Sequence, residues 1–167
     1  MNQRMIDSTC PCCKHTFWIK RDTVCVAGIH PTLEELLDQN IYFRHKCSQC
    51  QTIYEFGHPF LFRDPDRKYV IILSEKKEFD NLEKDDELIL CDNVKDFEFC
   101  FRVKRQGCSI EFVRSIQKQF QEKEKNEVFF DQWDPDNQCL WFLVDGQPKG
   151  VRLNKSQQEA LLERKIL

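Results

Sequence analysis

The sequence predicts an α+β fold in two parts, a β-rich first part of about residues 1–75 and a mixed second part of residues 76–167. In the first part, short runs of aromatic and β-branched residues alternate with turn residues, as expected for strands. In the second part, a longer run repeats apolar residues at helical spacing. No repeat or Gly/Ser-rich linker divides the chain, so the two parts could pack as one unit.

One short helix is expected among the strands of the first part. Pro31 marks its start, Thr32 and Glu35 form a capping-box pattern, and leucines follow at helical spacing, which predicts a helix of about seven residues. A turn at Asp64-Pro65-Asp66 precedes the last strand. The expected strands are residues 17–19, 24–29, 41–46, 52–56, 59–62 and 69–73.

The second part is expected to contain two helices and a hairpin. Residues 97–103 alternate apolar with mostly charged side chains, which predicts a strand. Residues 109–125 repeat apolar residues every three or four positions, which predicts a helix. A second capping box, from Ser156 to Glu159, opens the final helix. Short strands are expected at residues 128–130, 139–144 and 151–153, the last two joined around Asp145-Gly146.

Charge and hydropathy exclude some classes of protein. The net charge is −3, whereas a dedicated nucleic-acid binder usually has a basic domain. No apolar stretch approaches the ~20 residues of a membrane span, and residues 1–10 lack the apolar core of a secretory signal. We therefore expect a soluble, cytoplasmic protein without membrane contacts. The acidic residues 83–87 are expected to form a surface loop.

Two pairs among the ten cysteines have the spacing of metal ligands. Cys10-Pro11-Cys12-Cys13 and Cys47-Ser48-Gln49-Cys50 are C-x2-C pairs, and in a reducing compartment such thiols bind metals more often than they form disulfides. Each pair can turn both sulfurs toward one ion, so Cys10, Cys13, Cys47 and Cys50 are the predicted ligands of a tetrahedral site. Zinc suits four thiolates best, while iron, a disulfide or unmetallated thiols remain open.

A closed shell of four sulfurs leaves no coordination position for water or substrate, so the predicted zinc is structural and non-catalytic. The sequence also lacks a Gly-rich phosphate loop and a nucleophile elbow. It lacks the His-x-Glu with Pro-Cys-x-x-Cys of zinc deaminases, and the strands flanking the first pair disfavour a thioredoxin-like site. We therefore expect a protein that is not an enzyme, with a thiol-dependent redox enzyme using Cys12 as the weaker alternative.

The sequence around the cysteine pairs resembles the CpXC domain family over about residues 8–75. The resemblance rests on the first cysteine pair, Pro31-Thr32-Leu33 with Leu36-Leu37, Phe43, Phe60-Leu61-Phe62-Arg63-Asp64, Lys68 and Ile71-Ile72. It implies a bacterial, zinc-ribbon-like domain of uncharacterised function in residues 1–75, and supplies no catalytic residue. Residues 76–167 then form an α+β extension of unknown type.

Two positions depart from the family pattern. The second pair, CSQC, lacks proline, and Lys14 and Gln51 stand where such pairs are often followed by glycine. Glycine at that position eases a left-handed turn.

The remaining cysteines and the histidines are expected to be structural. Cys12 is expected to point away from the site, with Cys12 and His15 as fallback ligands. The expected core cysteines are Cys25, Cys100 and Cys139; Cys91 and Cys108 lie near loop boundaries and could be exposed; His30, His45 and His58 are expected in strands or loops.

Two groups of residues are candidate interaction surfaces, and a protein partner is favoured over nucleic acid. An aromatic group could be a groove or simply core: Phe129, Phe130, Trp133, Trp141 and Phe142. A basic stripe could contact nucleic acid or be a solvated helix face: Arg102, Lys104, Arg105, Arg114, Lys118, Lys123 and Lys125.

Overall fold

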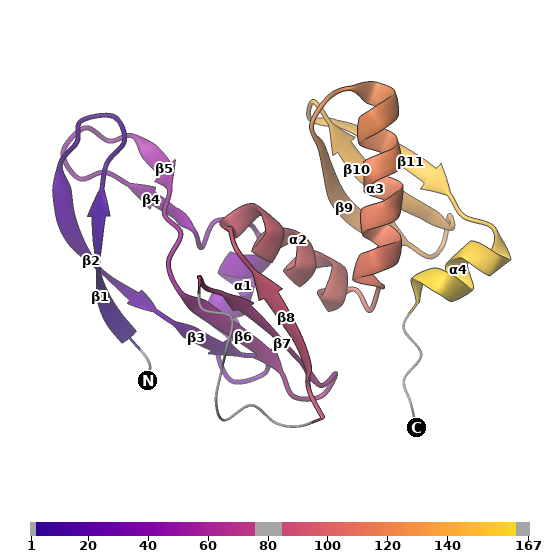
Figure 1. Cartoon of the computed structure of the whole chain (residues 1–167), viewed down its shortest axis with the longest axis horizontal. Coiled ribbons are helices and arrows are strands. Elements are labelled where there is room, and N and C mark those ends of the chain that lie inside the picture. The colour runs from indigo at the N-terminus through magenta and orange to yellow at the C-terminus, as the bar shows by residue number, and fades with distance from the viewer. Residues whose placement is uncertain (1–2, 76–84, 163–167) are drawn as a thin grey trace. The chain divides into compact units, whose positions relative to one another are not determined.

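The computed structural model describes residues 3–75 and 85–162, which contain four helices and eleven strands (Figure 1). The predicted α+β class is therefore confirmed. The chain divides into two compact units, Met1–Glu98 and Phe99–Leu167. The division into domains 1–75 and 76–167 stays a prediction. The expected acidic loop falls partly outside the described residues, since only its last three positions are described.

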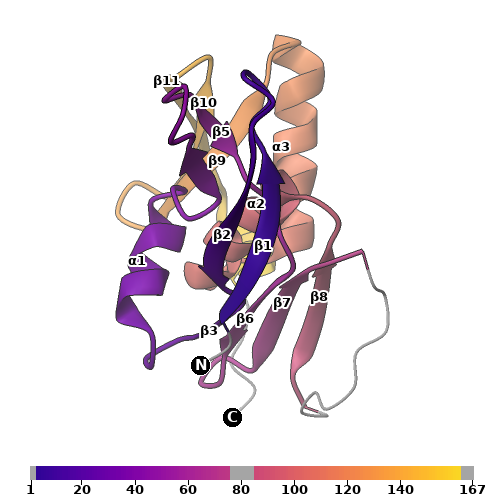
Figure 2. The same ribbon diagram turned by 90° about the vertical axis from the view of Figure 1, so that its left-hand side faces the viewer.

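The first unit contains two antiparallel hairpins (Figure 2). Strand β1 (Gln3–Thr9) pairs with β2 (Thr16–Asp22) along their whole length, and β4 (Arg44–Lys46) pairs with β5 (Ile53–Glu55). The β1–β2 hairpin has one face turned inward: Ile6, Ser8 and Ile19 are shielded from water, whereas their neighbours Asp7 and Trp18 are exposed. The alternation follows from the two-residue period of a strand.

A four-stranded sheet forms the rest of the first unit. Its order is β3 (Val24–Val26), β6 (Phe60–Asp64), β7 (Tyr69–Leu73) and β8 (Glu87–Cys91). The central pair β6–β7 is antiparallel, and both outer strands run parallel to their neighbours. Every residue of β7 is buried, and Phe43, Phe60 and Phe97 pack edge to face in the core.

Helix α1 (Pro31–Asp38) has eight residues, close to the expected seven. The helix begins at Pro31 as expected, but the expected Thr32–Glu35 capping box is wrong, because the N-cap is His30, two residues before Thr32, and no side chain caps the helix. Two side chains, from the N-cap residue and the first turn of helix α1, stabilise the turn that precedes the helix. The His30 ring accepts a hydrogen bond from Val26 N–H at 3.0 Å, and Glu34 accepts one from Gly28 N–H at 2.9 Å.

The strand expected at residues 97–103 is wrong, because these residues belong to helix α2 (Val94–Arg105). Its buried residues Val94, Phe97 and Phe101 are three and four apart, which is helical spacing. Asn93 accepts a hydrogen bond from the backbone N–H of Asp96 at 2.8 Å and so caps the helix. The second part of the chain therefore has one helix more than expected.

In the second unit, helix α3 (Ile110–Glu124) lies against a three-stranded sheet with the order β11 (Gln147–Arg152), β10 (Cys139–Val144) and β9 (Val128–Asp134). The expected helix and hairpin are confirmed. Helix α4 (Lys155–Leu161) is also present, but Asn154 and Gln157 form its capping box in place of Ser156 and Glu159. The core includes Val113, Ile116, Val128, Phe130, Leu140, Phe142 and Leu161.

The burial of the other cysteines matches expectation only in part. Cys25 and Cys100 are buried and Cys139 is half-buried. Cys91 and Cys108, whose exposure the sequence left open, are also buried; Cys91 ends β8 and Cys108 pairs with Leu162 in an isolated bridge. In the described part of the chain, no helix combines the length and apolar character that a membrane crossing requires.

Candidate metal centre

The two C-x2-C pairs occupy the turns of the two hairpins, and Figures 1 and 2 show both hairpin tips side by side. The two turns have the same backbone hydrogen bonds. Cys10 N–H donates to His15 O at 2.9 Å, and Cys47 N–H donates to Thr52 O at 2.8 Å. In return, Lys14 N–H and Gln51 N–H donate to the carbonyl oxygens of Cys10 and Cys47. The sequence therefore builds the same turn twice.

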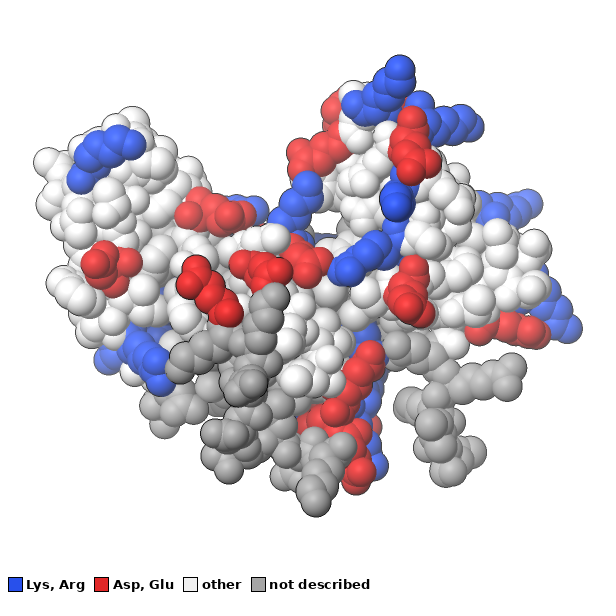
Figure 3. Space-filling model, viewed as in Figure 1, with Lys and Arg blue, Asp and Glu red and all other residues white. Residues whose placement is uncertain are grey.

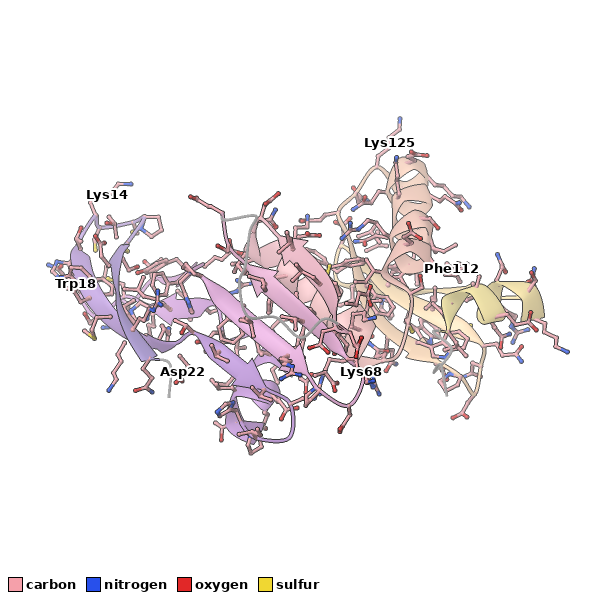
Figure 4. The ribbon with its side chains drawn as sticks, turned by 60° about the horizontal axis from the view of Figure 1, so that its bottom comes forward. Lys14, Trp18, Asp22, Lys68, Phe112 and Lys125 are labelled. Carbon is pink, nitrogen blue, oxygen red and sulfur yellow. The ribbon has the colours of Figure 1, made fainter. Side chains whose placement is uncertain are left out.

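Lys14 and Gln51, which stand where glycine was expected, adopt the left-handed conformation that glycine would ease. Their φ angles are +63° and +66°. Lys14 lies at the tip of the β1–β2 hairpin (Figure 4). Both turns thus keep their geometry without glycine, at the steric cost that a side chain meets in this conformation.

The four predicted ligand sulfurs lie within 4.8 Å of one another. The Cys10–Cys50 and Cys13–Cys47 sulfur distances are both 3.6 Å. A tetrahedral ion with metal–sulfur bonds of about 2.3 Å separates its sulfurs by about 3.8 Å, whereas a disulfide bond is only about 2.05 Å long. The spacing fits four thiolates around one ion and excludes disulfides within this arrangement.

Local hydrogen bonds make two of the sulfurs easier to ionise. The Thr52 hydroxyl lies 3.2 Å from the Cys50 sulfur, and donation to the thiolate, with a further backbone hydrogen bond, lowers the pKa of Cys50 to about 6. Backbone N–H groups of Cys50 and Gln49 likewise lower the pKa of Cys47. Ligand thiols must lose their protons to bind a metal, so these contacts favour binding.

The sulfur of Cys13 is harder to ionise than those of Cys47 and Cys50. The backbone N–H of His15 lowers the pKa of Cys13, but burial and the three neighbouring sulfurs outweigh it and raise the pKa to about 12. Four thiolates at this spacing repel one another unless a positive ion lies among them. The donor set therefore fits a divalent, sulfur-binding cation.

The fallback ligands lie outside this cluster. Cys12 is exposed. The His15 ring is also exposed and stacks on Phe17, with ring centres 5.4 Å apart. Neither belongs to the group of four sulfurs.

Side-chain contacts join the two hairpins next to the cysteine cluster, and the sequence did not predict them. The Ser8 and Tyr54 hydroxyl groups lie 2.5 Å apart, joining β1 to β5. Arg21 on β2 reaches His45 Nδ1 on β4 at 3.3 Å, and burial followed by the charge of Arg21 lowers the pKa of His45. The alternation of side chains along a strand predicts which residues face inward. It does not predict which residues of two distant strands come into contact.

Four members of the basic stripe are engaged within the second unit. The Arg102 side chain donates to Asp131 O at 3.3 Å, and Lys104 is only 3% exposed. The guanidinium groups of Arg105 and Arg114 lie over the rings of Phe101 and Phe99. The other three members are exposed: Lys118 and Lys123 on α3, and Lys125 at its C-cap.

The predicted aromatic group is divided between core and surface. Phe130 and Phe142 are buried, Trp133 and Trp141 are half-buried, and Phe129 is exposed. The most exposed tryptophan is Trp18 on β2, at 66%, which the sequence analysis did not single out. Trp18 points away from its hairpin in Figure 4.

The fold and the cluster define a mixed α+β protein with a four-cysteine cluster, placed on two hairpin turns, that could hold a metal ion. The model of the CpXC protein family matches residues 8–136, most of the chain, so the protein belongs to the CpXC family. The match extends beyond the expected residues 8–75 and reaches the end of β9 in the second unit. No curated protein and no solved structure matches the chain.

Proposed function

We propose that the cluster of Cys10, Cys13, Cys47 and Cys50 binds one structural Zn²⁺ and that the protein acts without catalysis by binding another protein. The observation that carries the zinc assignment is the 3.6 Å spacing of the sulfurs, close to that of a tetrahedral thiolate site. Four sulfurs complete the coordination of zinc, so water has no position on the ion. The metal would then fix two hairpins that are short on their own.

The outer face of the β1–β2 hairpin supports the binding role. Trp18 is 66% exposed and Met5 is 57% exposed, and both lie on the face opposite the buried Ser8 and Ile19. Covering large apolar side chains on a water-facing sheet removes apolar surface from water, which favours the binding of a partner. Tryptophan often contributes most of the binding energy in such contacts. The engaged basic stripe gives less support to nucleic-acid binding, since its arginines already contact acidic or aromatic groups.

A capture experiment tests the binding role. The zinc-loaded full chain, a Trp18→Ala variant and a Phe129→Ala control should be used as baits after nuclease treatment. We expect a stoichiometric protein partner that the wild type and the control retain and that Trp18→Ala loses at least tenfold, with zinc content unchanged. Co-purifying RNA or DNA with salt-sensitive affinity, or equal capture by all three baits, would contradict the proposal.

We also propose the bacterial cytoplasm as the location of the protein. The supporting argument is chemical: ten cysteines, all free in the structure, suit a reducing compartment.

A further inference from the structure

The first unit contains a cavity of about 590 Å³ that is separate from the sulfur cluster. The cavity lies beside the end of β7, the start of α2 and the segment that precedes β6. The buried side chains of Leu73 and Val94 form part of its wall. This volume is within the range of small-ligand sites.

The charged groups around this cavity are acidic. Its lining includes the exposed residues Glu55, Glu75 and Asp92. Arg44 neutralises Glu55 through an ion pair at 3.3 Å. Within residues 3–75 and 85–162, Glu75 and Asp92 have no ion-pair partner. In Figure 3, Asp and Glu side chains gather on the first unit around the end of β8 and the start of α2.

His58 is a buried residue in the wall of the same cavity. It lines the cavity, is only 5% exposed, and packs against Phe43, Phe56 and other aromatic rings. Its Nδ1 lies 3.1 Å from the Pro59 carbonyl oxygen. A carbonyl can only accept, so Nδ1 carries the proton and Nε2 of the neutral ring is an acceptor. This buried Nε2 has no hydrogen-bond partner in the described part of the chain.

We propose that this cavity binds the ammonium or guanidinium group of a Lys or Arg side chain on the protein partner, an inference that rests on the proposed function. Among residues 3–75 and 85–162, the carboxylates of Glu75 and Asp92 have no ion-pair partner, and a basic side chain supplies several donors with a positive charge. Its methylene stem would lie against Leu73 and Val94.

A single metal ion fits this cavity less well than an organic cation. Metal ligands converge on one point, but among the described residues no three ligand atoms of Glu55, His58, Glu75 and Asp92 come within 4.8 Å of one another. A guanidinium or ammonium group on a flexible stem can instead satisfy acceptors that lie farther apart.

Binding of a short peptide tests the inference. The probe is the capped peptide Gly-Leu-Arg-Leu-Gly, titrated into the zinc-loaded full chain and followed by ¹H–¹⁵N spectra, with the Arg→Gln peptide, free L-arginine and spermidine in parallel. The test variant is Glu75→Gln/Asp92→Asn. The control, Asp66→Asn/Asp136→Asn, changes two exposed carboxylates away from the cavity by the same net charge.

We expect the Arg peptide to shift resonances of residues 57–58 and 73–75 and to bind at least tenfold more weakly to the test variant, with the control within twofold of wild type. The Gln peptide should bind at least tenfold more weakly than the Arg peptide. No binding, or an equal loss in both variants, would overturn the cavity assignment. Equal affinity for free L-arginine or spermidine would overturn the peptide source. Trp18-dependent capture would survive either result, so the failure of this inference is distinguishable from that of the proposed function.

Discussion

Lys14 and Gln51 show how single residues affect the metal centre. Both hold positive φ angles, a backbone conformation that glycine adopts more readily than other residues. A side chain makes this conformation less favourable, because its Cβ crowds the backbone. The cysteine spacing predicted the ligands, but only the structure shows that these two residues adopt the glycine-like conformation.

Lys14→Gly should therefore stabilise the zinc-loaded protein by about 0.5–1 kcal/mol, since relief of the left-handed strain exceeds the added entropy of the unfolded chain. Chemical denaturation with zinc present measures the change. Lys20→Gly is the matched control on the exposed face of β2, where the backbone is extended and glycine should cost about 0.5–1 kcal/mol. Equal destabilisation by both changes would contradict the account of the turn.

His58 should make stability depend on pH. Burial lowers its pKa and nearby Arg21 lowers it further, which outweighs the hydrogen bond to Pro59 that raises it. The unfolded chain therefore binds a proton at higher pH than the folded one, and stability falls as pH drops below about 6.5. We expect a smaller loss between pH 7.5 and 5.5 for His58→Phe, measured by urea denaturation. An identical loss in both proteins would show that His58 does not contribute.

At the scale of elements, the sequence predicted those helices and strands whose stability depends on residues close together in the chain. Helix α3 was predicted from its apolar residues at helical spacing, and the structure adds Ser109 as its N-cap. Strand β1 was missed because it has few apolar residues and is defined by pairing with β2. Strand β8 was missed because its apolar residues lie within an acidic stretch. In α2, Phe97 and Phe101 satisfy both alternation and helical spacing, so the pattern alone could not choose.

The cap of α4 provides a direct test at this scale. Asn154 accepts from Gln157 N–H at 2.8 Å, and Gln157 accepts from Asn154 N–H at 2.9 Å. Asn154→Ala should cost about 1 kcal/mol in the unfolding of the second unit. Ser156→Ala, which changes the serine that the sequence suggested, should cost a few tenths of that. Trp133 and Trp141 fluorescence during urea unfolding reports the difference, and a larger cost for Ser156→Ala would reject the observed cap.

At the scale of the whole molecule, the cysteine spacing was informative because one cluster of four sulfurs joins two segments that are distant in the sequence. The four ligands could be chosen from spacing alone, whereas the Ser8–Tyr54 and Arg21–His45 contacts could not, because they depend on how the hairpins meet. The cavity was equally unreadable, since its lining comes from strand ends and a helix start that are far apart in the sequence.

The central claim is that four thiolates hold one structural zinc ion. Metal analysis, X-ray absorption and thermal unfolding should be applied to the wild type, Cys47→Ser and the control Cys12→Ser. We expect one zinc per chain with four sulfurs at about 2.3 Å in the wild type and in Cys12→Ser. Cys47→Ser should lose zinc and the folded first unit, because structural zinc contributes ~10–16 kcal/mol in small modules. Iron with visible absorbance, zinc loss in Cys12→Ser, or retained zinc with unchanged melting in Cys47→Ser would contradict the claim.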